Sequence, residues 1–188
     1  IPYKKDVIPY CAGLSETARA IGAVNTIVRR PDGTLWGDNT DAYGFSMLVQ
    51  ASSVDVTGKK ALVFGSGGAS LTAQYVLKTL GAREIVVISR HGADNYENLD
   101  RHADAQIAVN TTPVGMYPNT GVSPVSLGRF PKLEAALDVV YNPARTEFLL
   151  QAERLGIPCA NGLLMLTAQA KKSCEDFTGQ PVPDSRIT

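Results

Sequence analysis

A glycine-rich turn, GSGGAS at residues 65–70, stands between two segments of different periodicity. The preceding run, ALVF at 61–64, is apolar throughout, which predicts a short strand buried on both faces. From Ala73 onward, apolar residues recur at helical spacing until Gly81 ends the pattern. A strand, a glycine turn and a helix in this order indicate a dinucleotide-binding unit, because small residues let the backbone approach a pyrophosphate. An ordinary strand-to-helix turn is the alternative.

Alternating apolar strands and amphipathic helices follow this turn. The expected strands are residues 84–89, 105–109, 136–140 and 157–160, and the expected helices are residues 146–155 and 163–177. Strands that alternate with helices predict a parallel sheet with right-handed crossovers. We therefore expect residues 58–160 to form a Rossmann-like dinucleotide-binding domain.

The first 55 residues have a different texture and predict a second lobe. Ser15 and Gly22 are a plausible cap and stop for a short helix, and a Pro-Asp-Gly turn at 31–33 predicts a hairpin. A further helix is expected from about Ala42. We expect an α/β protein with two lobes, in which residues 1–55 form a partial substrate-binding domain and residues 162–188 pack back on it.

Composition limits the class of partner. The 188 residues carry 18 basic and 18 acidic side chains, so a neutral chain with no basic run is not expected to bind nucleic acid or a membrane surface. Three cysteines and two histidines are scattered, which predicts no metal site. No apolar run of about 18 residues and no leader is evident. We expect a cytoplasmic protein, monomer or homodimer, that acts on a small molecule.

The end of the second strand of this domain predicts which cofactor binds. Sites for NAD usually carry Asp or Glu there, to bind the ribose 2′-hydroxyl. This strand ends in Ser89 and Arg90, and a guanidinium pairs well with a 2′-phosphate, so NADP is expected. An ordinary exposed arginine is the alternative. The segment NTTPVGM at 110–116 lies where parallel sheets bind ligands, although its residues also suit a plain turn.

Candidates for acid and base chemistry lie outside the dinucleotide segment. Lys4 is followed by a second lysine, and Asp41 ends the polar cluster DNTD. A solvated lysine pair and a helix cap are the simpler interpretations of these two residues. His91 and His102 lie in a polar stretch and are expected at the surface, with no nucleophile–histidine arrangement to argue from.

Seven blocks resemble one family in order along the whole chain. They are IPYK at 1–4, IGAVNTIV at 21–28, GDNTDAYGF at 37–45, GSGGAS at 65–70, NTTPVGM at 110–116, DVVYNPARTEFL at 138–149 and NGLLMLTAQA at 161–170. In these blocks the chain resembles shikimate dehydrogenase, the NADP-dependent enzyme that reduces 3-dehydroshikimate to shikimate in aromatic amino-acid biosynthesis.

The resemblance implies a role for each matching residue. Lys4 and Asp41 would be the catalytic pair at the reacting hydroxyl, and which of the two carries the proton stays open. Asn25, Asp41, Tyr141 and Gln169 would bind substrate. Gly65, Ser66, Gly67, Gly68 and Ala69 would hold the pyrophosphate, Ser89 and Arg90 the 2′-phosphate, and Thr111, Val139 and Gly162 would complete the cofactor site.

Departures from the family pattern keep other interpretations open. Leu71 stands where a basic residue is common, and Ser89 replaces a common Asn. IPYK matches only the tail of a longer family motif, so the N-terminal part of the substrate domain is expected to be missing. The alternatives are a truncated, non-catalytic NADP-binding module and a dehydrogenase of quinate or a related cyclitol.

Overall fold

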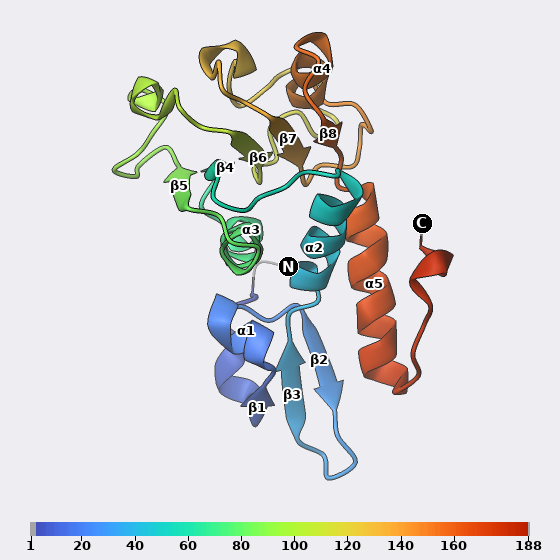
Figure 1. Cartoon of the computed structure of the whole chain (residues 1–188). Coiled ribbons are helices and arrows are strands. Elements are labelled where there is room, and N and C mark those ends of the chain that lie inside the picture. The colour runs from blue at the N-terminus through green and yellow to red at the C-terminus, as the bar shows by residue number, and fades with distance from the viewer. Residues whose placement is uncertain (1–2, 188) are drawn as a thin grey trace.

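The computed structural model describes residues 3–187, so the first two residues of the IPYK block and Thr188 lie outside the described residues. Two sheets lie at opposite ends of the molecule, with a layer of helices between them (Figure 1). Within residues 3–187, no helix has the length and apolar character that a membrane crossing requires.

The larger sheet has five strands, all parallel, in the order β5-β4-β6-β7-β8. The strands are β4 (Lys60–Phe64), β5 (Glu84–Ile88), β6 (Ile107–Asn110), β7 (Ala135–Asp138) and β8 (Cys159–Ala160). Every residue of β4, β6 and β7 is buried, as expected for a parallel sheet covered on both faces. The predicted parallel α/β architecture is confirmed.

Two of the crossovers contain the predicted helices, α3 (Gly68–Thr79) after β4 and α4 (Glu147–Arg154) after β7. The connections on either side of β6 contain only the short 3₁₀ turns η2 (Leu99–His102) and η3 (Leu127–Arg129). The chain between β5 and β6 is rich in Asn, Asp and Gly, which favour turns over helix.

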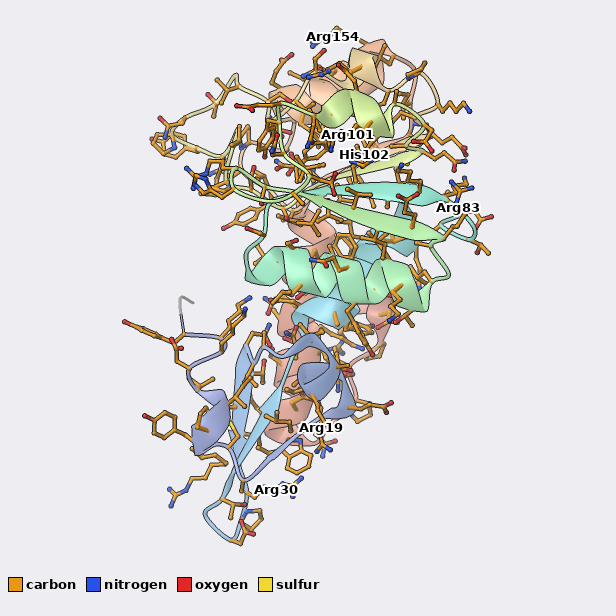
Figure 2. The ribbon with its side chains drawn as sticks, turned by 90° about the vertical axis from the view of Figure 1, so that its left-hand side faces the viewer. Arg19, Arg30, Arg83, Arg101, His102 and Arg154 are labelled. Atoms are coloured by element: carbon orange, nitrogen blue, oxygen red, sulfur yellow. The ribbon has the colours of Figure 1, made fainter. Side chains whose placement is uncertain are left out.

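His102 corrects the expectation that both histidines are surface residues. Its side chain is buried beside the large sheet (Figure 2), and its Nε2 lies 2.8 Å from a carboxylate oxygen of Asp94. The pair ties η2 to the loop that follows β5. A polar stretch of sequence thus supplies a buried histidine and its hydrogen bond, which its composition did not indicate.

The smaller sheet has the order β1-β3-β2, from β1 (Gly13–Leu14), β3 (Leu35–Asp38) and β2 (Thr26–Arg29). β2 and β3 form the predicted hairpin, and at its turn Asp32 accepts a hydrogen bond from the Thr34 amide. Beside the sheet lie η1 (Ile8–Tyr10) and α1 (Glu16–Ile21), which Ser15 caps by accepting from the Ala18 amide at 3.0 Å. Arg30 marks the hairpin end of this lobe in Figure 2.

Two long helices join the lobes: α2 (Asp41–Ala51) and α5 (Leu163–Thr178), which the short turn η4 (Asp184–Arg186) follows. They pack side by side below the large sheet (Figure 1). Phe45 of α2 is fully buried in the same hydrophobic cluster as Val63 of β4 and Met165 of α5. The helix α2 therefore covers one face of the large sheet while its first residue faces the small lobe.

Candidate active site

The glycine turn lies between the end of β4 and the start of α3, at the carboxyl edge of the large sheet. Gly65 has a φ of +107°, and a Cβ there would lie 2.9 Å from the Thr111 hydroxyl oxygen, so this position requires glycine. A Cβ at Gly67 would meet nothing within 4 Å. Backbone amides at the start of a helix can donate hydrogen bonds to a pyrophosphate when the space in front of them is open, as it is here.

A cavity of about 660 Å³ opens at this turn. Its walls are Gly65, Ser66, Gly67, Ser89, Arg90, Tyr96, Thr111, Thr112, Pro113, Val114, Ser123 and Pro124. The cavity brings the glycine turn together with the residues predicted to hold a 2′-phosphate and with the NTTP segment. These residues fit NADP, because they offer free amides, hydroxyls and one guanidinium but no carboxylate.

Tyr96 belongs to this cavity and was missed in the sequence. Its ring stacks on Phe64 with the two centroids 6.3 Å apart, and burial raises the pKa of its hydroxyl. An aromatic side chain beside Arg90 offers a flat surface to an adenine ring. The only signal in the sequence was one aromatic residue in a polar stretch after the second strand.

Lys4 and Asp41 form an ion pair in which Nζ lies 2.5 Å from Oδ2. Lys4 is held through its backbone, whose carbonyl oxygen accepts from the Val24 amide at 2.7 Å, and Asp41 opens α2. Both side chains are partly buried. The carboxylate is therefore the partner of a lysine 37 positions away rather than only a helix-start residue, and the lysine is not simply solvated.

A second cavity, of about 430 Å³, surrounds this pair. Its walls are Lys4, Asn25, Asp41, Ala69, Val139, Tyr141, Gly162, Met165, Leu166 and Gln169. All predicted catalytic and substrate-binding residues therefore line one cavity, together with three of the predicted cofactor residues. A Cβ at Gly68 would lie 3.4 Å from Cδ of Lys4, so the glycine turn and the lysine are neighbours.

The amides in this cavity are held by different means. Asn25 accepts hydrogen bonds on Oδ1 from the Thr40 amide at 2.9 Å and the Thr26 hydroxyl at 3.0 Å. Gln169 lies on α5, and its Nε2 donates to the Leu166 carbonyl at 2.9 Å. Tyr141 is half exposed at the rim. A rigid amide, a second amide and a phenol facing one space suit a ligand with several hydroxyls.

Gly162 explains how the loop after β7 meets α5. A Cβ there would lie 2.0 Å from the carbonyl oxygen of Val139, and the Gly162 amide donates to the Val140 carbonyl at 3.0 Å. Only glycine allows the two backbones to approach this closely. Ser89 and Arg90, in contrast, lie in the first cavity and not in this one.

A glycine turn at the edge of a parallel sheet, facing a lysine–carboxylate pair on another lobe, defines a two-lobed dehydrogenase of the Rossmann type. Shikimate dehydrogenase (NADP(+)) of Clostridium perfringens strain SM101 is 38% identical over 198 residues, which span 98% of this chain and 73% of that protein. The chain belongs to the shikimate dehydrogenase family.

Further comparisons agree with this assignment. A family model described as the shikimate dehydrogenase substrate binding domain matches residues 1–27. A chorismate mutase/shikimate 5-dehydrogenase fusion protein from Clostridium acetobutylicum superposes with a TM-score of 0.93 at 34% identity, covering all of this chain and 72% of that one. Shikimate 5-dehydrogenase from Thermus thermophilus, in complex with NADP(H) and shikimate, superposes with a TM-score of 0.86 at 32% sequence identity. The match covers all of this chain and 74% of that one.

Proposed function

We propose that this protein is an NADP-dependent shikimate dehydrogenase, an oxidoreductase that interconverts 3-dehydroshikimate and shikimate. One observation carries the proposal: the Lys4–Asp41 pair shares a cavity with Val139 and Gly162, directly beside the glycine turn. This arrangement puts a proton-transfer pair next to the expected nicotinamide site. Membership of the family supports the same function.

The cofactor side of the reaction rests on the first cavity. NADP, when bound, supplies the hydride acceptor, and NADPH supplies the donor. Gly65 makes the turn, with its own amide donating to the Ile88 carbonyl at 2.8 Å, and the residues that follow, through Ala69, offer backbone amides to the pyrophosphate. The exposed Arg90 beside Ser89 pairs with the 2′-phosphate. The Thr111 hydroxyl donates to the Phe64 carbonyl at 2.7 Å and so fixes the wall of the cavity beside the turn.

The substrate side rests on the second cavity. Asn25, Gln169 and Tyr141 bind ring hydroxyls, and a site built to hydrogen-bond hydroxyl groups discriminates strongly between hydroxyl patterns. Lys4 and Asp41 hold the proton at the reacting oxygen, since the ammonium donates to a carbonyl oxygen and the pair accepts a proton from a hydroxyl. Substrate and cofactor thus meet between the two lobes.

The wider assignments belong to the same proposal. Residues 1–55 with 162–188 form the substrate lobe, and residues 58–160 form the NADP lobe, with the boundary between α2 and β4. A reaction of this kind belongs to chorismate biosynthesis in the cytoplasm. We propose a monomer or a homodimer.

A spectrophotometric assay tests the function. The protein is mixed with shikimate and NADP, and formation of reduced nicotinamide is followed by its absorbance. We expect turnover with this pair, and slower turnover when NAD replaces NADP or quinate replaces shikimate. No turnover with either cofactor contradicts the proposal. Faster turnover with quinate and NAD than with shikimate and NADP would instead identify the protein as a quinate dehydrogenase.

A further inference from the structure

Asp138 is a fully buried carboxylate to which the proposed reaction gives no role. It ends β7, between the two cavities but in neither lining. Its Oδ1 accepts from the Val140 amide at 2.9 Å and from Nδ2 of Asn110 at 3.0 Å. Its Oδ2 accepts from the Thr146 hydroxyl at 2.6 Å. One side chain therefore joins the ends of two neighbouring strands and the start of α4.

The Asn110 branch of this network leads to the cofactor cavity. Asn110 is also fully buried, and its Nδ2 donates in addition to the Val114 carbonyl at 3.3 Å. Its Oδ1 accepts from the amide of Thr112 at 3.0 Å and from the hydroxyl of Thr112 at 2.7 Å. Asp138 thereby orients the amide that fixes the loop at 111–114, which is one wall of the cofactor cavity.

The Val140 branch leads to the substrate cavity. The Val140 amide donates to Asp138, and the Val140 carbonyl accepts from Gly162 at the start of α5. The residues on either side of Val140 are Val139 and Tyr141, and both line the second cavity. The position of this loop therefore depends on the same carboxylate as the loop at 111–114.

In the fold, the ionised form of this carboxylate is less favourable than its protonated form. Burial raises the pKa of Asp138 to about 6, although its three hydrogen bonds each lower it. The cost of burying the charge offsets part of what these hydrogen bonds contribute to stability. The contribution of Asp138 is therefore better sought in the positions of the two loops than in the stability of the core.

We propose that Asp138 is a positioning residue that holds two loops in fixed relation to each other: the cofactor loop, residues 111–114, and the loop of residues 139–141, where Val139 lies at the expected nicotinamide site and Tyr141 at the substrate. This inference rests on the proposed function, because it assumes that the two cavities take NADP and shikimate. Loss of the carboxylate therefore weakens the binding of both NADP and shikimate, although Asp138 lines neither cavity.

The test compares Asp138→Ala with Asp138→Asn, which keeps an acceptor oxygen for Val140 and Asn110. The control is Ile107→Val, a buried change at the far end of β6. The Kd of NADP is measured by titration calorimetry and the KM of shikimate by initial rates. We expect Asp138→Ala to raise both constants about tenfold, the effect of one lost hydrogen bond of about 1.4 kcal/mol at each loop. We expect Asp138→Asn to stay within about threefold and Ile107→Val to lower only the melting temperature.

The outcomes separate the two proposals. If Asp138→Ala does not fold, Asp138→Leu removes the same acceptors while filling the space, and the same increases are expected. Wild-type constants in a folded Ala or Leu variant, or an increase in only one constant, overturn the positioning role. The positioning role is also overturned if Ile107→Val raises the two constants as much as Asp138→Ala does. A wild-type protein that binds neither ligand refutes the proposed function, and this inference with it.

Discussion

Replacing Asp138 by Asn changes how the stability of the fold depends on pH. Burial raises the pKa of this carboxyl group from 3.8 to about 6 in the folded chain. The folded state therefore binds the proton more tightly than the unfolded state does. Stability contributed by this group is full below about pH 4 and is lost as the pH rises through about 6. Asn has the same shape, stays neutral and has no such loss.

The pKa change sets the size of the effect. A rise from 3.8 to about 6 corresponds to about 3 kcal/mol of unfolding free energy, at about 1.4 kcal/mol for each pH unit. The unfolding free energy of Asp138→Asn minus that of the wild type should therefore increase by about 3 kcal/mol between about pH 3 and pH 7. For a chain of this size, the corresponding difference in melting temperature is about 6–12 °C.

Urea unfolding followed by circular dichroism, at closely spaced pH values, measures this difference. All other ionisable groups are common to the two proteins, so their contributions cancel in the subtraction. A difference that stays constant from acid to neutral pH would show that Asp138 does not titrate in this range. A difference of the opposite slope would show that its hydrogen bonds outweigh its burial.

Three further predictions concern the site. Lys4→Ala should lower kcat about a hundredfold or more while the Kd of NADP stays within about threefold, and the exposed neighbour variant Lys5→Ala should change neither in the same assays. Arg90→Asp should weaken NADP binding by about tenfold to a hundredfold and leave NAD binding nearly unchanged. Calorimetry with both cofactors measures this, with Arg101→Asp as the charge-matched control. Equal losses of NADP and NAD affinity would contradict the assignment. Gly162→Ala should cost about 3 kcal/mol of unfolding free energy because its Cβ has no room, and unaltered urea unfolding would refute this close approach.

Local signals in the sequence predicted most of the elements correctly. The apolar run before the glycine turn, the helix capped by Ser15 and the hairpin at 31–33 all depend on neighbouring residues, and each is present. The connection between β5 and β6, for which no helix was expected, also follows local signals. Its sequence is rich in turn-forming residues, and the structure has only the short turn η2 there.

Contacts between segments that are distant in sequence could not be predicted from local sequence patterns. The pairing of Lys4 with Asp41 entered only through the family resemblance, because neither residue has a neighbour in sequence that indicates the other. Tyr96 and His102 show the same limit, since their burial depends on how an irregular loop folds over the sheet. Asp138 was expected in the middle of the strand at 136–140, and only its three hydrogen-bond donors show that it joins two strands and a helix.

The packing of α2 against α5 has a consequence for how the protein is made. The two helices come from opposite parts of the chain, yet Phe45 and Met165 share one core beneath the large sheet. During synthesis, α2 leaves the ribosome long before α5 has been made, so the apolar face of α2 stays exposed to solvent. Contacts of such long sequence separation form late and slowly. We therefore expect the nascent chain to need protection from aggregation until α5 has emerged.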